Sequence, residues 1–146
     1  MESNEDNRRI LVVSNSFNKL SLYISSLRWI GYHEVGKAGN LSEALEQVRK
    51  FEPNLVLVDS TRSSNVGLGI CRDIRQSCSS DIIIAGVYSK FEHGDLSKSY
   101  QKVGADGSIE ESIITSDKQS FKKELEKIIQ GAYLKRSGGN PVERQY

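Results

Sequence analysis

Apolar residues form short continuous runs at three places in the chain. The runs cover residues 10–13, 54–58 and 82–87, and they are almost wholly apolar and rich in β-branched side chains. This composition is typical of parallel strands that are buried on both faces. Gly86 weakens the third run, because glycine has no side chain to pack. The three runs predict the central strands of one sheet.

Segments with helical spacing separate these runs. Apolar side chains recur every three or four residues in two of them, the first with Leu20, Ile24, Leu27 and Ile30 and the second with Leu41, Ala44, Leu45 and Val48. The spacing predicts two amphipathic helices. Gly31 is placed to end the first helix, and Asn40 with Glu43 is placed to cap the start of the second.

The alternation continues through the rest of the chain. Helices are expected over 67–75 and 95–103, and a weak strand over 107–110. A last helix follows, which Ser116 can cap. Its apolar stripe, with Lys and Glu on the outer side, consists of Phe121, Leu125, Ile128, Ile129 and Ala132. This stripe predicts a helix that packs one face against the sheet.

Strands and helices that alternate five times predict an α/β fold. We expect a flavodoxin-like, doubly wound, five-stranded parallel sheet with five helices in a single domain. The folded domain is expected over 9–134, after a flexible N-terminus over 1–8. A flexible tail or the start of a linker is expected over 135–146, where Gly, Pro and charged residues replace apolar ones.

Composition and charge narrow the functional classes. The 146 residues are 37% hydrophobic and 27% charged, which suits one globular domain and leaves no room for a second. The 20 basic and 19 acidic residues nearly cancel, so charge does not favour nucleic acid or a membrane surface as a partner. No apolar run approaches the roughly 18 residues of a spanning helix, and the first residues lack the apolar stretch of a signal peptide. We therefore expect a cytoplasmic protein.

The two cysteines do not indicate a disulfide framework or a zinc site. Cys71 and Cys78 lie seven residues apart, without a second pair and without a neighbouring histidine. Cys71 is expected to be a small buried side chain. His33 and His93 are expected to be solvated and not to bind a metal.

Polar side chains follow the predicted strands directly. They form the loops 14–16, 59–61 and 88–90, and Glu110 and Glu111 follow the weak fifth strand. In an open parallel sheet, ligands bind at the carboxyl ends of the strands, where the winding direction reverses. Asp59 stands out because an apolar strand leads straight into its carboxylate, which must find solvent, a cation or a hydrogen-bond donor. Asp59 is either a functional carboxylate or the cap of a turn.

Several segments together resemble the successive blocks of a response-regulator receiver domain, over roughly residues 9–134. These segments are ILVVSNS, GY, LSEALEQVRK, EPNLVLVDS, GLGICRDIR and KVGADGSI. The resemblance implies that Asp59 takes the position of the aspartate that a histidine kinase phosphorylates, and Gly67 that of a loop glycine. It also implies an acidic pair after the first strand that holds Mg²⁺, a Thr or Ser after the fourth strand, and a Lys after the fifth.

Most of these accompanying groups are replaced. Ser14 and Asn15 stand where the acidic pair is expected, and neutral side chains bind a hard cation more weakly than carboxylates do. Glu111 stands where the lysine is expected, so the charge that would face a phosphoryl group is reversed. We expect no protein cation near Asp59, and the weak metal candidates are Asn15 and Asp59. No cofactor is expected; Mg²⁺ would bind only if Asp59 is phosphorylated after all.

Two further positions of the family's pattern are altered or uncertain in this chain: the hydroxyl residue after the fourth strand and the aromatic residue that couples to it. Ser89 matches the hydroxyl position by spacing, but a gap of one or two residues would place Val87 or Gly86 there instead. Ser108 replaces the aromatic residue that usually couples to this hydroxyl. Thr61, in the loop after Asp59, is a further position of the altered site.

Three functions fit this pattern. The first is a receiver-like domain without enzymatic activity that works independently of phosphorylation, binding a signalling protein or a second copy of itself through its last two helices and fifth strand. The second is an atypical receiver still phosphorylated on Asp59, with Asn15, Glu110 or Glu111 helping to hold a metal. The third is a flavodoxin-like domain that binds a small ligand. We favour the first, because the replacements remove separate requirements of phosphoryl transfer.

Overall fold

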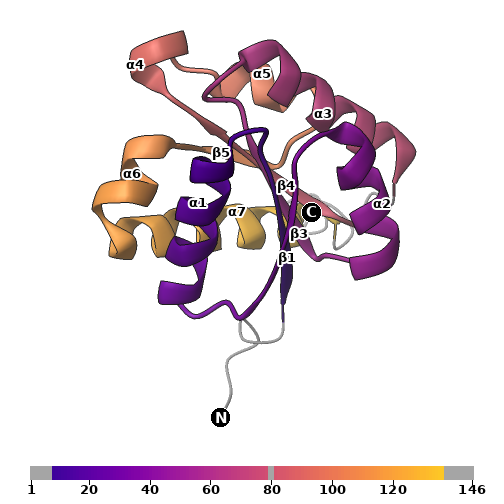
Figure 1. The fold of residues 1–146 in the computed structure, drawn as a ribbon, viewed down its shortest axis with the longest axis horizontal. Helices are drawn as coiled ribbons and strands as arrows, with labels where there is room; N and C mark the ends of the chain where they lie inside the picture. The colour runs from indigo at the N-terminus through magenta and orange to yellow at the C-terminus, as the bar shows by residue number, and fades with distance from the viewer. Residues whose placement is uncertain (1–7, 79–80, 137–146) are drawn as a thin grey trace, which may run out of the picture.

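A single parallel sheet forms the centre of the molecule (Figure 1). The computed structural model describes residues 8–78 and 81–136. The strand order is β2-β1-β3-β4-β5. The strands are β1 (Arg9–Val13), β2 (Glu34–Ala38), β3 (Leu55–Asp59), β4 (Ile83–Tyr88) and β5 (Gly107–Glu110). The predicted five-stranded parallel sheet is confirmed, and the order reverses its direction at β1, as in other doubly wound folds.

Helices cover both faces of this sheet. They are α1 (Phe17–Trp29), α2 (Leu41–Phe51), α3 (Ser64–Ser77), α4 (Lys90–His93), α5 (Ser97–Lys102), α6 (Glu111–Ser116) and α7 (Lys118–Arg136). Side chains of α1, α6 and α7 share one hydrophobic core with the sheet, and those of α2, α3 and α5 share the other. The apolar stripe predicted for the last helix is the buried face of α7.

Two short helices were not predicted, so the described residues contain seven helical segments and not five. Helix α4 makes one turn because Ser89 caps its start and Gly94, with a φ of 76°, ends it. Helix α6 is separated from α7 by Asp117, whose backbone is extended. Both short helices thus lie in segments that were expected to be loops, directly before an expected helix.

The capping predictions are confirmed at two helices and corrected at a third. The Glu43 N–H donates to Asn40 Oδ1 at 2.9 Å, and Gly31 follows α1 with a φ of 114°. Ser116 does not cap the last helix: it ends α6. The Ser120 N–H donates to Asp117 Oδ1 at 3.2 Å, so Asp117 caps α7.

The described part of helix α7 reaches Arg136, two residues beyond the expected boundary at 134. Residues 137–146 of the expected tail and residues 1–7 of the expected flexible N-terminus lie outside the described residues. Cys71 is fully buried, as expected, and burial raises its pKa to about 12. Its thiol is therefore not a nucleophile at neutral pH.

Candidate functional site

The carboxyl ends of β1 and β3 bring Ser14 and Asp59 together. Val13 of β1 pairs with Val58 of β3, so the next residues along the two strands, Ser14 and Asp59, also lie beside each other. The Ser14 hydroxyl donates to Asp59 Oδ2 at 2.7 Å, and the Thr61 N–H donates to Asp59 Oδ1 at 2.9 Å. Both carboxylate oxygens of Asp59 thus accept hydrogen bonds from neutral groups of the chain itself.

Tyr23 of α1 lies between two carboxylates. Its hydroxyl oxygen is 2.9 Å from Glu111 Oε2 and 3.4 Å from Asp59 Oδ1, and the side chain is fully buried. A phenol has one proton, so the hydroxyl donates mainly to Glu111 at the shorter distance. Burial, and then the charges of Asp59 and Glu111, raise the pKa of Tyr23. Tyr23 therefore stays a protonated donor at neutral pH.

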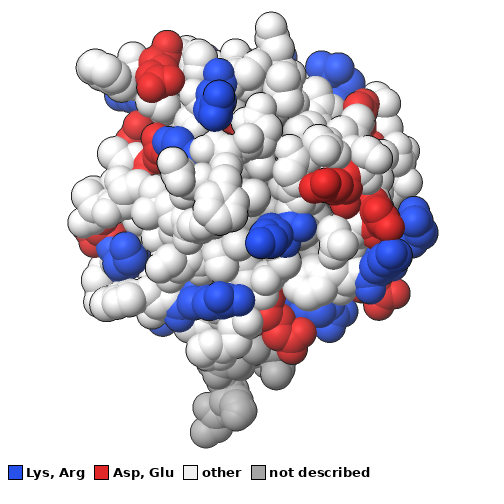
Figure 2. Space-filling view, in the orientation of Figure 1, with Lys and Arg blue, Asp and Glu red and all other residues white. Residues whose placement is uncertain are grey.

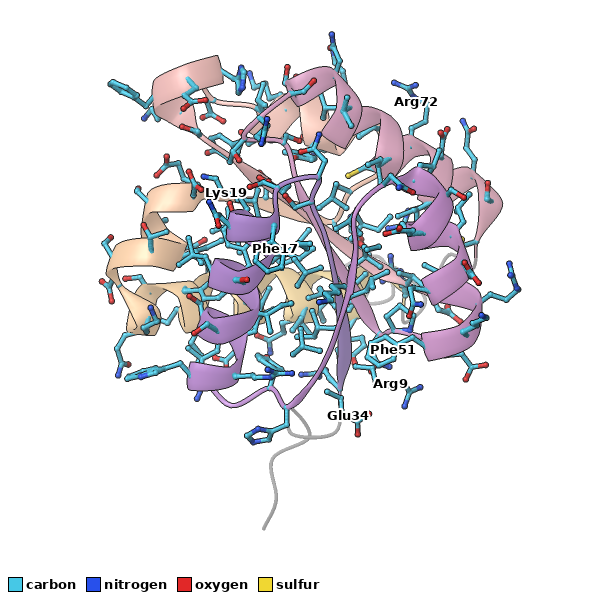
Figure 3. The ribbon with its side chains drawn as sticks, in the orientation of Figure 1. Arg9, Phe17, Lys19, Glu34, Phe51 and Arg72 are labelled. Carbon is cyan, nitrogen blue, oxygen red and sulfur yellow. The ribbon has the colours of Figure 1, made fainter. Side chains whose placement is uncertain are left out.

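Lys19 supplies a cation that the sequence analysis missed. Its ammonium forms an ion pair with Glu111 Oε2, and the two side chains are 29% and 17% exposed. Figure 3 labels Lys19 on the first turn of α1, on the side that faces α6. The expectation of a site without a protein cation is therefore wrong. A local signal did exist, because Lys19 and Tyr23 are four residues apart and so lie on one side of the helix.

Two further predicted residues differ in their relation to Asp59. Asn15 is exposed and lines a small cavity together with Asp59. The Glu110 carboxylate accepts from the backbone N–H groups of Lys90 and Ser112, each at 3.2 Å. Glu110 therefore links the end of β5 to α4 and α6 and does not complete an acidic cluster at Asp59.

The end of β4 carries Ser89, the candidate for the hydroxyl position by spacing, and Val87, one of the two alternatives. Val87 pairs with Asp59 in the sheet, its side chain is buried, and its carbonyl accepts from the Ser60 N–H at 2.8 Å. Ser89 caps α4 by accepting from the Glu92 N–H at 3.4 Å. The assignment of Ser89 to the family's hydroxyl position stays a prediction.

Thr61 connects the site to α4. Its carbonyl lies 3.1 Å from His93 Nε2, so His93, expected to be solvated, instead contacts the loop after β3. The Thr61 side chain, with its hydroxyl, is only 3% exposed. Within the described residues, this hydroxyl has no hydrogen-bond partner.

Tyr100 of α5 provides an aromatic ring near Ser108. Ser108 pairs with Gly86, and a Cβ on Gly86 would lie 2.1 Å from the Tyr100 ring. The ring thus occupies the space that only glycine leaves open. The Tyr100 hydroxyl hydrogen-bonds with Ser60 and donates to the Val87 carbonyl at 3.0 Å. Tyr100 is fully buried and held in place by these contacts, whereas Ser108 is half-buried.

The donor set around Asp59 does not fit Mg²⁺, the ion that the receiver resemblance implies. Asp59 offers one carboxylate, and the proton of the Ser14 hydroxyl already points to it. Glu111 is engaged by Lys19 and Tyr23. Across the parts of the chain that the structure describes, no three His, Cys, Asp or Glu side chains form a group that could hold a metal ion. A hard cation needs several such oxygen ligands.

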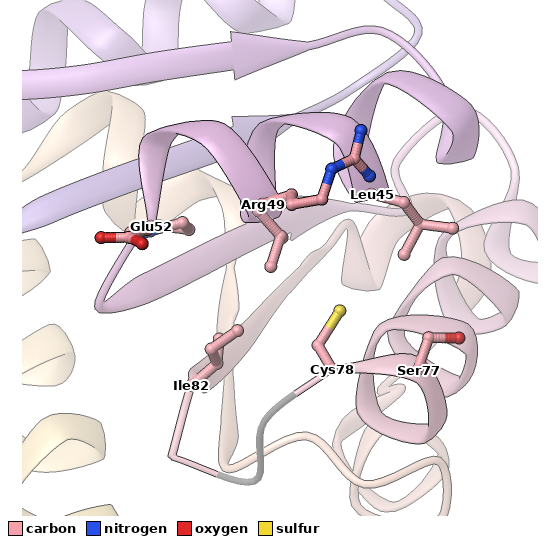
Figure 4. Close-up of a pocket in the computed structure, with 8 residues that line it drawn as sticks. Leu45, Arg49, Glu52, Ser77, Cys78 and Ile82 are labelled. Atoms are coloured by element: carbon pink, nitrogen blue, oxygen red, sulfur yellow. The ribbon is translucent and has the colours of Figure 1, made fainter.

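Two cavities differ in position and lining. A cavity of about 140 Å³ adjoins Asp59, which is small beside the roughly 300–1,000 Å³ of pockets for drug-sized ligands. A larger one, of about 550 Å³, lies between the C-terminal parts of α2 and α3 (Figure 4). The Cys78 sulfur points toward α2 there, whereas the charged ends of Arg49 and Glu52 point away. Burial raises the pKa of Cys78, so this cavity holds no activated thiolate.

Charge is mixed on the face of the molecule seen in Figure 2. Basic and acidic side chains alternate there without a large patch of one sign. None of the described helices is both long and apolar enough to cross a membrane.

Comparisons with known proteins identify the fold. No protein-family profile matches the chain, and no curated protein matches it in sequence. Among solved structures, a response regulator from Thermotoga maritima is 24% identical, with a TM-score of 0.67 over 84% of this chain and 98% of that one. The chemotaxis response regulator CheY4 of Vibrio cholerae is 21% identical, with a TM-score of 0.64 over 83% of this chain and 98% of that one.

A longer structure matches as well. It is described as a "probable two-component system response regulator/GGDEF domain protein", and it is 22% identical with a TM-score of 0.74. The match covers 88% of this chain and 52% of that one, so this chain spans about half the length of that protein. Together these likenesses establish the receiver fold that the sequence predicted.

Proposed function

We propose that this chain is a signalling domain with the receiver fold that works through protein–protein contacts and does not need phosphorylation at Asp59. The observation that carries the proposal is the state of the two carboxylates. Asp59 accepts hydrogen bonds from Ser14 and Thr61, and Glu111 is paired with Lys19. Each group is satisfied by the chain itself, so no phosphoryl group or metal is required to hold the site together.

The same contacts disfavour phosphoryl transfer. That reaction depends on positioning and on cations that neutralise the transferring group. Lys19 is the cation closest to the site in the ion pairs of the described residues, and Glu111 already neutralises it. A phosphoryl group on Asp59 would therefore face Glu111 without a free counter-charge.

The small cavity beside Asp59 supports a protein-binding function over the binding of a small metabolite. At about 140 Å³ it has no room for a nucleotide-sized ligand. For the interaction surface we propose the face formed by α5, β5 and α7. Strand β5 is at the edge of the sheet and contacts both helices, so all three elements are available together to one partner or to a second copy of the chain (Figure 1).

The proposal is tested by incubating the protein with acetyl phosphate and Mg²⁺ and measuring its intact mass. We expect no shift, while a receiver domain that has the acidic pair and the lysine shifts by one phosphoryl group in the same reaction. A stoichiometric, Mg²⁺-dependent shift that is absent in Asp59→Asn would refute the proposal and establish an atypical phosphorylated receiver.

The surface is tested with charge reversal on α7. Lys122→Glu with Lys123→Glu is expected to weaken self-association, measured by sedimentation, or the capture of a partner by the immobilised domain. Unchanged behaviour in both measurements would exclude this face.

A further inference from the structure

The small cavity beside Asp59 is lined by one charged side chain among neutral ones. Nine residues line it, and among them Asp59 is the only charged one. Neutral polar groups come from the loops after β1 and before α2 and α3, namely Ser14, Asn15, Asn40 and Ser63. A single carboxylate thus lies in a narrow slot whose other polar groups are uncharged.

Three other residues that line this slot are apolar. Leu41 belongs to the first turn of α2, and Val66 and Ile70 belong to the first half of α3. Val66 is 50% exposed, which places it at the mouth, whereas Ile70 is 7% exposed. A slot with apolar lining residues and a carboxylate matches a side chain that has an aliphatic stem and a cationic end, because lysine and arginine bury their methylene groups along apolar surfaces.

Charges around the slot also favour a cation. The positive ends of the dipoles of α2 and α3 lie at the starts of these helices and would repel a cation. Asn40 and Ser63 cap these two starts, because their side-chain oxygens accept from the N–H groups of Glu43 and Val66. The Glu43 carboxylate accepts from the Gly39 N–H at 2.7 Å and so adds a second negative charge at the rim. This charge offsets the positive ends of the two helices.

Asp59 has no cationic partner within the chain that the structure describes. The ion pairs among residues 8–78 and 81–136 do not include it. Lys19, the cation of the site, is held by Glu111 on the side of α6. The carboxylate retains acceptor capacity, since an ionised carboxylate has about four lone-pair sites and three donors of the chain lie within reach.

We propose that this slot receives one lysine or arginine side chain of a protein partner. Its stem would pack on Leu41, Val66 and Ile70, and its charged end would donate to Asp59. This inference rests on the proposed function, because it needs Asp59 as a free carboxylate that is not phosphorylated. It assigns the retained aspartate a role in recognition.

The experiment uses two capped pentapeptides as probes, Ala-Ala-Arg-Ala-Ala and the same peptide with citrulline, the neutral isostere of arginine. Each is titrated into the ¹⁵N-labelled full chain while amide chemical shifts are recorded. We expect saturable shifts at Ser14, Asn15, Asn40 and Ser63 with the arginine peptide alone. Asp59→Asn should weaken binding by about tenfold or more, because the acceptor of the hydrogen bond loses its negative charge. Asp73→Asn, on α3 but outside the slot, is the matched control and should bind as the wild type does.

Several outcomes would overturn the inference. These are shifts that do not saturate, equal shifts with the citrulline peptide, or equal binding by Asp59→Asn. Shifts of the same amides by MgCl₂ alone, with displacement of the arginine peptide, would assign the slot to a metal ion. The footprint is read on the wild type, so the test does not depend on the folding of a variant. An unphosphorylated protein with an unresponsive slot refutes this inference alone, whereas phosphorylation by acetyl phosphate refutes the proposed function.

Discussion

The Glu111 carboxylate pairs with the Lys19 ammonium, although the two residues are 92 positions apart in the sequence. The pair joins the first turn of α1 to the first turn of α6, and Tyr23 donates to the same carboxylate. An acidic residue at the end of β5 is thereby compensated by a base from α1. The Glu111 charge is thus neutralised by Lys19, although the lysine of the family's pattern is replaced, whereas Asp59 takes part in no ion pair of the described residues.

The strength of this pair can be measured with a double-mutant cycle of Lys19→Met and Glu111→Gln. Because both side chains are partly buried, we expect a coupling of about 1 kcal/mol in the free energy of unfolding from urea denaturation. If the effects of the two single substitutions simply add up in the double variant, the coupling is zero and the pair does not stabilise the fold.

Tyr23 makes stability depend on alkaline pH. Its pKa is raised in the folded protein above the ordinary value near 10, so the unfolded state loses this proton first as the pH rises. The stabilisation is complete below pH 10 and is lost progressively above it. We expect Tyr23→Phe to reduce the loss of stability between pH 9 and about 11.

The measurement is a urea midpoint at each pH for the wild type and the variant, and Tyr133→Phe, an exposed tyrosine, is the control. Tyr23→Phe should also lower stability at pH 7 by about 1 kcal/mol, because Glu111 loses a donor. Parallel pH curves for the wild type and Tyr23→Phe would contradict the role assigned to the phenol.

Asp106 ties α3 and α7 to the amino ends of β4 and β5. Its side chain is 5% exposed and lies 2.9 Å from Arg75 and 3.0 Å from Arg136. We expect Asp106→Asn to destabilise the fold by about 3 kcal/mol, because two partly buried guanidinium groups lose their shared anion. Chemical denaturation measures this cost.

The control is Glu46→Gln, which removes the exposed ion pair with Lys50 and should leave the denaturation midpoint unchanged. If Asp106→Asn also leaves the denaturation midpoint nearly unchanged, water replaces the carboxylate easily at the end of α7.

Restoring the three replaced groups should restore phosphoryl transfer. We expect the combined variant Ser14→Asp, Asn15→Asp and Glu111→Lys to gain a Mg²⁺-dependent phosphoryl group from acetyl phosphate, because it regains the metal ligands and the cation. Intact mass gives the result. The matched variant with Glu111→Gln in place of Glu111→Lys should react more slowly. An unmodified triple variant would mean that the contacts of Asp59 with Tyr23 and Thr61 block the reaction by themselves.

Several features of the fold could be predicted because they depend on local sequence. The central strands β1, β3 and β4 contain continuous runs of apolar residues, and the stripe on α7 has a helical period, so neither needs knowledge of distant residues. The cap of α7 was assigned to Ser116 and is Asp117, since two adjacent residues with capping side chains compete and the break after α6 decides between them. The contact of His93 with Thr61 likewise depends on the position of α4.

The sequence by itself determined the five-stranded α/β architecture, the position of Asp59 at the end of a central strand, and the replacement of the charged groups expected around it. Only the tertiary structure decided how those replacements are compensated. Because all five strands are parallel, the segments that follow β1, β3 and β5 lie at the same end of the sheet, so Lys19 and Tyr23 meet Glu111 there although it is remote in sequence. The attraction between Lys19 and Glu111 depends on the distance between them, and the packing of the whole chain sets that distance.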